Sequence, residues 1–334
     1  MESTRNKLIK ILAGNQDKYI SGQLLSERLN ISRNAVWKHM KELEKDGYVI
    51  VGKSNKGYKI TNTPNKLSEN TIQWGLNTQW LGRTIIHKET TASTQIIAHQ
   101  AAQDNAKHGT IIIADEQTKG RGRMDRTWHS AQNKGIWLSI ILRPAILPYL
   151  APQLTLLTAT VLAETIRSYT NTEPLIKWPN DILLNNKKTA GILTEMQAEQ
   201  DQIQYVVIGI GVNVNQTYNE LPQDVNLNAT SLQIETNKDW SIKNIIQDLL
   251  VTFEKSYETY MKNGFSEVKQ KWENSGFKIG ENILIKTSRD QWEAAFLGIA
   301  EDGALIYKGI DKEEKRLYSG EIEWFQGGEM DYVK

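Results

Sequence analysis

The sequence has no cysteine and no long apolar run among its 334 residues. The lack of cysteine excludes disulfides, thiolate metal sites and a cysteine nucleophile, so any chemistry must use other groups. No apolar stretch approaches the roughly 20 residues that are needed to cross a bilayer. The first ten residues also lack the apolar segment and small-residue cleavage site of a secretory signal. We therefore expect a cytoplasmic protein that does not cross a membrane.

Charge is distributed unevenly along the chain, although the formal net charge is only +1. Residues 1–62 contain 12 Lys and Arg against 6 Asp and Glu, which gives this segment a charge of +6 and leaves −5 for the remainder. Such segregation is typical of a nucleic-acid-binding domain joined to a body with another task. The length also favours two or three domains.

The first 63 residues predict a winged helix-turn-helix domain. Apolar spacing predicts a helix over Arg5–Ala13, and Ser21 and Ser32 are candidate N-caps of two further helices. A hairpin wing is expected within residues 48–60. The side chains expected to contact DNA are Arg33, Asn34, Trp37, Lys38 and Lys41 of the third helix and Lys53 and Lys56 of the wing. The alternative is a small protein-interaction domain whose lysines only face solvent.

The segment 64–272 alternates helical and strand patterns. Helices are expected at Ser68–Leu76, Ser93–Asn105, Gln153–Thr170 and Ile242–Lys262. Strands are expected at Thr110–Ala114, Gly135–Leu142, Ile176–Trp178, Ile182–Leu184, Thr189–Met196 and Gln204–Val214. Because several strands follow one another through short turns, we predict a mixed, largely antiparallel sheet with packed helices. The GxxxxGK[ST] and GxGxxG nucleotide motifs are absent.

A basic segment, EQTKGRGRMDRTWHS, covers residues 116–130. It places four basic residues between Lys119 and Arg126, with Asp125 as their only internal counter-charge. The two glycines of the segment let the backbone approach a ligand, and its arginines can fork onto phosphate or carboxylate oxygens. The pattern predicts an anion-binding loop. A basic surface loop or a second nucleic-acid contact is the alternative.

A second segment, KWPNDILLNNKKTAGILTEM, covers residues 177–196. Asn180 and Asp181 follow a strand in a turn, where functional side chains are often displayed. Lys188 then begins the return strand beside Gly191, which suits the close approach of a ligand. The alternative is that the lysines are solvated residues at the edge of a sheet.

The third segment, VIGIGVN at residues 207–213, is an apolar strand with glycines at positions 209 and 211. Because alternate residues of a strand share a face, the two glycines leave bare backbone on one side of the sheet. Such a surface makes room for a flat or elongated ligand, while a β-bulge is the structural alternative.

Six motifs occur in order behind the helix-turn-helix pattern: TTASTQ, EQTKGRGRMDRTW, KGIWLSIILRP, KWPNDI, KTAGILTEM and IGIGVNVN. With them the sequence resembles the biotin protein ligases over essentially its whole length. The N-terminal domain makes it similar to the bifunctional class that also represses biotin operons. The resemblance implies an α+β multidomain protein, in which the central domain has the class II synthetase-like catalytic fold.

The resemblance also implies the reaction. Biotin and ATP form biotinyl-5′-AMP and pyrophosphate, and the biotinyl group then passes to a lysine of a carrier protein. Neither step needs an enzyme nucleophile, so the lack of cysteine is no obstacle. The two anions that react must be held together, and cations offset their repulsion. Mg²⁺ is expected as a cofactor with ATP, and its ligands are not assigned.

Three groups of site residues follow from the resemblance. The catalytic residues are Lys188, Arg123, Lys177 and Asp181, with Asp181 orienting the incoming lysine. The biotin contacts are Ser93, Thr94, Gln117, Gly120, Arg121, Gly122, Lys188, Gly191 and Gly209. The adenylate and ATP contacts are Arg123, Arg126, Trp128, Asn180, Gly211 and Asn213. The chain departs from the family at Asp239 and Trp240, because the family pattern suggests an arginine after this aspartate as a triphosphate contact.

A small C-terminal domain is expected over residues 273–334. Its short strands are expected at Asn282–Lys286, Trp292–Gly298, Ala304–Lys308 and Lys315–Tyr318. This spacing and the family resemblance both fit a small SH3-like β-barrel. The domain would help to clamp ATP or the carrier protein, or it would serve as a structural cap.

The resemblance implies three partners. They are the biotin carboxyl carrier protein of acetyl-CoA carboxylase together with other biotin-dependent carboxylases, operator DNA, and a second copy of the chain in a homodimer promoted by biotinyl-5′-AMP. Two alternatives remain open. A lipoate or octanoate ligase shares the body fold and the adenylate chemistry, and a non-enzymatic regulator would sense a small carboxylate or nucleotide and bind DNA.

Overall fold

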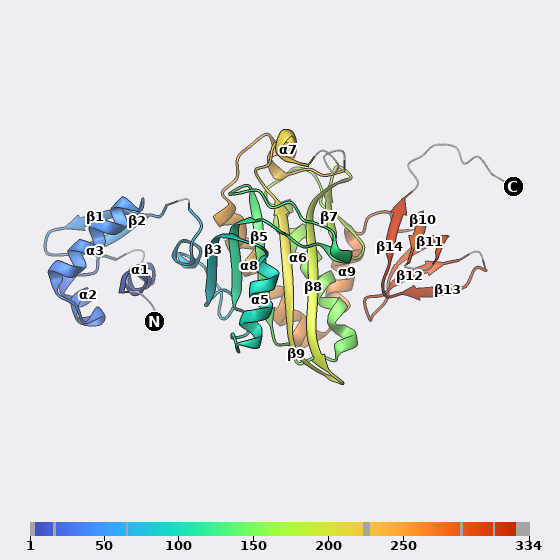
Figure 1. The fold of residues 1–334 in the computed structure, drawn as a ribbon, viewed down its shortest axis with the longest axis horizontal. Coiled ribbons are helices and arrows are strands. Elements are labelled where there is room, and N and C mark those ends of the chain that lie inside the picture. The colour runs from blue at the N-terminus through green and yellow to red at the C-terminus, as the bar shows by residue number, and fades with distance from the viewer. Residues whose placement is uncertain are drawn as a thin grey trace. The chain divides into compact units, whose positions relative to one another are not determined.

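The structure is a computed structural model that describes residues 4–15, 18–64, 66–222, 228–287, 290–309 and 311–324 (Figure 1). Contacts within the chain divide it into two compact units, Met1–Thr78 and Gln79–Lys334. The two units are described separately below. The domain boundaries expected from the sequence, after residues 63 and 272, stay predictions.

The N-terminal unit contains a helix-turn-helix followed by a hairpin. Its elements are α1 (Thr4–Ala13), α2 (Gly22–Leu29), α3 (Arg33–Lys45), β1 (Val49–Lys53), β2 (Gly57–Asn62) and α4 (Glu69–Gln73). Ser21 and Ser32 cap α2 and α3, because each hydroxyl accepts a hydrogen bond from a backbone N–H in the first turn. Leu25 of α2 and Val36 and Met40 of α3 are fully buried in one core. The predicted caps, helices and wing are therefore confirmed.

The larger unit is built around a seven-stranded sheet with the order β3-β4-β5-β9-β8-β7-β6. Its strands are β3 (Ile85–Thr91), β4 (Ile111–Gln117), β5 (Gly135–Leu142), β6 (Leu175–Lys177), β7 (Asp181–Leu184), β8 (Lys187–Glu199) and β9 (Gln202–Asn213). The pair β3 and β4 is parallel, while the five other pairings are antiparallel. This arrangement confirms the prediction of a mixed, largely antiparallel sheet.

Helices cover both faces of this sheet. They are α5 (Thr94–Gln103), α6 (Ala151–Arg167), α7 (Leu232–Thr236), α8 (Ile242–Asn263) and α9 (Ser266–Asn274). Thr194 of β8 is hydrogen-bonded to Thr155 of α6, whereas the next residue, Glu195, contacts His99 of α5. Because successive residues of a strand point to opposite faces, α5 and α6 lie on opposite sides of the sheet. The pocket described below lies on the α5 side.

A five-stranded antiparallel sheet forms the C-terminal part, in the order β13-β12-β11-β10-β14. Its strands are β10 (Asn282–Lys286), β11 (Gln291–Ile299), β12 (Leu305–Lys308), β13 (Glu314–Leu317) and β14 (Glu321–Trp324). Gln153 of α6 donates a 2.6 Å hydrogen bond to the carbonyl oxygen of Glu301, which ties this sheet to the central body. The sheet confirms the four strands that were expected in this segment and adds β14, which the sequence pattern did not reveal.

The sequence patterns also missed β3, α7 and α9. β3 has a mostly polar surface, and α9 buries only Val268 and Trp272, so neither has the regular apolar spacing on which prediction depends. Within the described part of the chain, no helix has the length and apolar character that spanning a membrane requires.

Candidate active site

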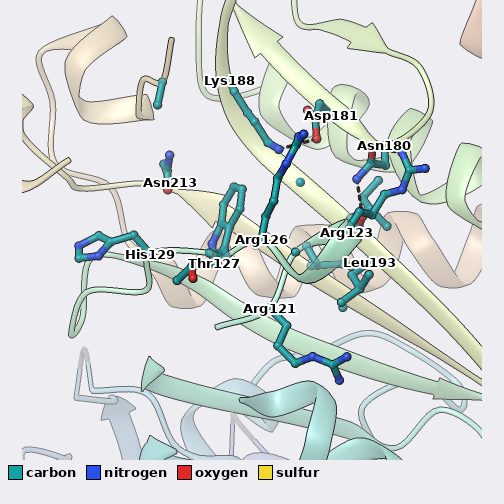
Figure 2. A pocket seen from close by; sticks show the side chains of 18 of the residues that line it. Arg121, Arg123, Arg126, Thr127, His129, Asn180, Asp181, Lys188, Leu193 and Asn213 are labelled. Carbon is teal, nitrogen blue, oxygen red and sulfur yellow. Dashed lines mark hydrogen bonds and ion pairs between the residues drawn. The ribbon is translucent and has the colours of Figure 1, made fainter. Parts of the chain in front are cut away.

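A cavity of about 570 Å³ lies over β5, β8 and β9 on the α5 side of the central sheet. This volume is within the range of small-molecule sites. It brings together most of the residues that the sequence singled out, namely Ser93, Thr94, Gln117, Arg121, Gly122, Arg123, Arg126, Trp128, Lys177, Asn180, Asp181, Lys188, Gly191, Gly209, Gly211 and Asn213 (Figure 2). The three segments identified by their composition therefore converge on one pocket.

Residues 117–130 form one wall of this pocket as a short hairpin. Bridges pair Gln117 with Ser130 and Arg121 with Thr127. A Cβ on Gly120 would lie only 2.3 Å from the carbonyl oxygen of Trp128, so the hairpin can close here only without a side chain. Gly120 is not among the residues that line the pocket. It packs behind the lining, and a direct ligand contact of its backbone stays a prediction.

Cationic side chains gather at one end of the pocket, around the turn between β6 and β7. Lys188 Nζ lies 2.7 Å from Asp181 Oδ1, and Figure 2 shows the two side chains pointing toward each other. Arg123 donates a 3.3 Å hydrogen bond to Asn180 Oδ1, while Asn180 Nδ2 donates a 2.8 Å hydrogen bond to the carbonyl oxygen of Ile192. Asn180 thus fixes the arginine against the edge of the sheet.

Burial lowers the pKa of two cationic groups at this end of the pocket, Lys177 and Arg123. The pKa of the Lys177 side chain is lowered, first by burial and then by the charge of Lys188, while Asp181 acts in the opposite direction. Burial is also the main cause that lowers the pKa of Arg123; Asp181 and Glu321 act in the opposite direction, and Arg126 adds a smaller lowering. Both effects indicate positive charges that are incompletely solvated. An anion bound among them would compensate for the lost solvation.

The floor of the pocket is bare backbone. Gly191 of β8 and Gly211 of β9 are direct partners in the antiparallel register. A Cβ on Gly191 would lie 3.0 Å from the Trp128 ring, and a Cβ on Gly211 would lie 2.6 Å from it. The indole therefore rests on this glycine pair, with Lys188 Nζ 5.2 Å from its centroid. Its Nε1 is buried without a hydrogen-bond partner, which marks a donor that a ligand can satisfy.

The opposite end of the pocket is polar and well ordered by hydrogen bonds. The backbone N–H of Thr94 donates to Gln117 Oε1 at 2.8 Å, and the Thr94 hydroxyl lies 2.9 Å from that of Ser139. Gln117 Nε2 donates to the hydroxyl of Ser130 at 2.8 Å. Ser93 caps α5 at the same place. These groups can supply hydrogen-bond donors and acceptors to a compact polar ring of a ligand.

Sequence reasoning missed two residues at this end. Ser139 interrupts the apolar strand IWLSIIL, which was a usable signal for a functional hydroxyl. Gln95 gave no such signal, but it lines the pocket and accepts a 3.0 Å hydrogen bond from Ser139. A Cβ on Gly209 would lie 2.7 Å from Gln95 Oε1, so the glycine makes room for this amide.

Asn213 is held at the other side of the cationic end. Its Nδ2 donates to the carbonyl oxygen of Thr230 at 3.0 Å, and its Oδ1 accepts a 3.0 Å hydrogen bond from Gln216. Trp240, the residue that departs from the family pattern, has a structural role instead. Its indole nitrogen donates to the hydroxyl of Thr236, and its ring packs edge-on against Tyr169.

The C-terminal sheet contributes residues to the pocket that the sequence analysis did not single out. Glu321, Ile322 and Glu323 of β14 line it. Arg126 Nη2 lies 2.6 Å from Glu321 Oε1. The last described strand therefore engages one of the predicted nucleotide contacts.

The DNA contacts expected from the sequence all lie on the surface of the N-terminal unit. Exposed side chains are found at Arg33, Asn34, Trp37, Lys38, Lys41, Lys53 and Lys56. Trp37 is 54% exposed, which is unusual for a large aromatic side chain. The first five residues belong to α3 and the two others to the β1–β2 hairpin and its turn. Their exposure is compatible with the predicted contacts, since a recognition helix and a wing are the elements that face DNA in this class of domain.

No group of three or more His, Cys, Asp or Glu side chains capable of holding a metal ion occurs among the residues described by the structure. Mg²⁺ often binds through one or two carboxylates together with substrate phosphates and water, so a protein cage is not required.

Two family models match the sequence. Residues 87–213 match the biotin/lipoate A/B protein ligase family, and residues 4–59 match a helix-turn-helix (HTH) domain. The first match covers the three segments that converge on the pocket. The second covers α1 to α3, β1 and the first residues of β2.

Individual proteins are similar over nearly the whole chain. The bifunctional ligase/repressor BirA of Bacillus subtilis is 44% identical, over 97% of this chain and 99% of that protein. The Escherichia coli protein of the same name is 27% identical, over 97% and 95% respectively. Among solved structures, the biotin protein ligase from Aquifex aeolicus in complex with biotin and ATP has a TM-score of 0.63 at 29% identity, covering 72% of this chain and 98% of that one.

Proposed function

This chain belongs to the family of bifunctional biotin ligases and repressors, and we propose that its pocket joins biotin to AMP and then to a carrier protein. The chain is an ATP-dependent biotin protein ligase and, through its helix-turn-helix domain, a transcriptional repressor. One observation carries the assignment of the pocket. Its polar Thr94 end and its cationic Lys188 end are joined by the bare glycine floor.

In the first step, the polar end binds the ureido ring of biotin and the cationic end binds the reacting anions. Ser93, Thr94 and Gln117 provide the donors and acceptors for the ring. The biotin tail runs along the glycine floor, so that its carboxylate reaches Lys188. Lys188 and Arg123 offset the charge of this carboxylate and of the α-phosphate, which allows the attack that releases pyrophosphate.

Trp128 and Arg126 complete the nucleotide side. The indole now rests on Gly191 and Gly211, and its unpaired Nε1 supports a role at the bound adenylate. Asn213 is fixed by two hydrogen bonds and would contact the nucleotide from the opposite side. Binding therefore rearranges the 117–130 hairpin over a pocket whose floor is already formed.

In the second step, the lysine of the carrier protein attacks the acyl-adenylate, and AMP leaves. The lysine must be neutral to attack, so a carboxylate near the acyl group has a use in this step. Asp181 is ion-paired with Lys188 and lines the pocket, and we assign to it the orientation of the incoming lysine. The carrier is the biotin carboxyl carrier protein or another biotin-dependent carboxylase.

Mg²⁺ enters with ATP in this proposal. We expect it to bind mainly through phosphate oxygens and water, as Mg²⁺ commonly does in nucleotide sites. The ion supplies further charge neutralisation for the triphosphate. Lys177 and Arg123 of the protein help to neutralise the same phosphate charges.

As a repressor, the chain binds operator DNA as a homodimer that biotinyl-5′-AMP promotes. The adenylate would order the 117–130 hairpin, and a surface ordered in this way costs less conformational entropy when a second copy binds. A twofold dimer presents two α3 helices to an inverted repeat. The exposure of Trp37 and of the basic residues on α3 and the wing supports this assignment.

The ligase assignment is tested by the release of pyrophosphate in the presence of ATP and Mg²⁺ with biotin, with lipoate or with neither. Transfer to a biotin carrier domain is then followed by mass spectrometry. Biotin-dependent release and a modified carrier lysine are expected. Release that requires lipoate would favour a lipoate ligase, and a folded protein that binds biotin without release would be a non-enzymatic regulator.

The repressor assignment is tested separately by deleting residues 1–64. The shortened protein should lose operator binding and keep adenylate formation, because the pocket lies in the larger unit. Operator affinity that survives the deletion would mean that DNA binding resides elsewhere in the chain.

A further inference from the structure

Arg121 differs from the other arginines of the pocket because its guanidinium is held at the rim. Its Nη2 lies 3.3 Å from Glu195 Oε1 on β8. Figure 2 shows its side chain pointing away from Lys188 and Asp181, whereas Arg126 extends toward them. The Arg121 side chain is therefore not one of the cations gathered around Asp181.

Glu195 occupies a defined position relative to the pocket. It shares a face of β8 with Leu193, which lines the cavity, and it lies beyond that residue toward α5. Along the strand it is roughly 13 Å from Gly191, at about 3.3 Å per residue. The carboxylate thus lies behind the polar, biotin end of the pocket and far from the cationic end.

Both oxygens of the Glu195 carboxylate are engaged. Oε1 contacts Arg121, while Oε2 lies 3.1 Å from His99 Nε2 on α5. His99 is itself oriented by the hydroxyl of Tyr205, 3.4 Å from its Nδ1. The pKa of Glu195 is lowered, first by the hydrogen bond with His99 and further by Gln95 and by the charge of Arg121. The carboxylate is a fixed anion between a helix and the hairpin.

The hairpin needs such an anchor at this point. Its base is held to the chain before α5, because the backbone N–H groups of Thr118 and Lys119 donate to the carbonyl oxygens of Thr91 and Ala92. At Arg121 the backbone pairs with the other half of the hairpin, at Thr127. The ion pair with Glu195 ties this residue to β8 of the central sheet.

We propose that Glu195 is a positioning residue for biotin binding, which holds the hairpin over the polar end of the pocket by anchoring the side chain of Arg121. His99 holds the carboxylate in place from α5. The inference rests on the proposed function, because the proposed function identifies the ligand at the Thr94 end as biotin. Glu195 itself touches neither biotin nor the reacting atoms.

The test is a double-mutant cycle in the full chain. Glu195→Gln removes the charge with little change of shape, Arg121→Gln removes the partner, and the double variant removes both. Biotin affinity is measured by calorimetry, and steady-state kinetics give KM and kcat. Glu199→Gln is the matched control, because Glu199 is an exposed residue of the same strand whose side chain contacts only Gln204 among the hydrogen bonds described.

Each single variant is expected to weaken biotin binding and raise the KM for biotin roughly fivefold, the upper range for a partly exposed ion pair. For Glu195→Gln, the kcat at saturating biotin and the KM for ATP should stay unchanged, because the cationic end is not affected. The double variant should bind biotin no worse than the weaker single variant, which shows that the two residues act together. Glu199→Gln should match the wild type.

Additive losses in the double variant, or a Glu195→Gln variant that equals Glu199→Gln, would overturn the inference. A fall in kcat with an unchanged KM for biotin would do the same. Arg121 is an exposed hairpin residue, so its variant keeps the test valid if Glu195→Gln fails to fold. If the wild type itself does not bind biotin, the proposed function fails, and this outcome is distinct from a failure of the Glu195 inference.

Discussion

The indole of Trp128 and the backbone of Gly211 share one space, since a Cβ on Gly211 would lie 2.6 Å from the indole nitrogen. Trp128 belongs to the hairpin between β4 and β5, and Gly211 to the central strand β9. The contact thus joins the hairpin, which must move when a ligand binds, to strand β9, which stays fixed. Occupation of the floor by ligand therefore requires the indole to shift.

Replacing Gly211 by alanine should test this relationship directly. The new methyl group displaces the indole and narrows the slot, so biotin affinity should fall by roughly tenfold, within the cost of inserting a methyl group into a packed site. Calorimetry gives the affinity and thermal unfolding gives the stability. Gly52→Ala is the control, because its Cβ would meet only the Tyr58 ring, at 3.9 Å. Unchanged biotin affinity would show that the ligand does not use the floor at Gly211.

Lys188→Ala should slow adenylate formation by roughly 10² to 10³-fold, the usual cost of removing one group that stabilises developing charge. Pyrophosphate release in the presence of saturating biotin and ATP measures the rate. The neighbouring residue provides a control, because Lys187 lies over the ring of Tyr218 and does not line the pocket. Equal rates in Lys188→Ala and Lys187→Ala would remove Lys188 from the chemistry.

Alkaline pH should destabilise the larger unit through Tyr257 of α8. Burial, with the neighbouring Tyr260, raises the pKa of Tyr257 to about 12, whereas an unfolded tyrosine titrates near 10. The contribution of this neutral, buried tyrosine to the free energy of unfolding is fully present below pH 10 and is lost as the pH rises through 12. Between these values the unfolded chain releases a proton that the folded protein retains.

Between pH 8 and pH 11 the free energy of unfolding should therefore fall less in Tyr257→Phe than in the wild type. The difference between the two decreases should be about 1 kcal/mol. Urea titrations at the two pH values measure the difference. Tyr149→Phe serves as the control, because Tyr149 is 65% exposed. A Tyr257→Phe variant with the same pH dependence as the wild type would contradict the role of this tyrosine.

Lys53→Ala in the wing should weaken operator binding without changing its sequence preference. If Lys53 contacts a backbone phosphate, the slope of log K against log salt should become shallower by about one unit. Binding titrations at several salt concentrations measure the slope. Lys7→Ala in α1 should leave it unchanged, since Lys7 is exposed on a helix outside the recognition surface. Identical slopes for both variants would exclude the wing from the interface.

Local patterns in the sequence predicted the parts of the site that lie on short, continuous segments. The strand, turn and return strand from Lys177 to Met196 form β6, β7 and β8 and bring Lys188 to Asp181, because a tight hairpin fixes the register of its strands. The helix caps Ser21 and Ser32 were equally visible, since a cap depends only on the next three residues.

Contacts between distant segments were not predictable in this way. Glu321 meets Arg126 across almost 200 positions of the sequence, and Ser139 of β5 meets Thr94 of α5 through the packing of a helix against the sheet. No local spacing encodes such pairs. The parallel strand β3 was missed for a related reason, because its pairing with β4 depends on the helix α5 that connects them and not on its own alternation.

The paired glycines at the centre of the sheet have a consequence for the evolution of the protein. Cross-strand side-chain pairs contribute about 0.2 to 1 kcal/mol each, and the chain has none where Gly191 faces Gly211. Larger residues at these positions would restore the missing pair, but they would displace the Trp128 indole and obstruct the slot. This weak point of the sheet is therefore tied to substrate uptake, and a protein that no longer needed uptake would be free to fill it together with its surroundings.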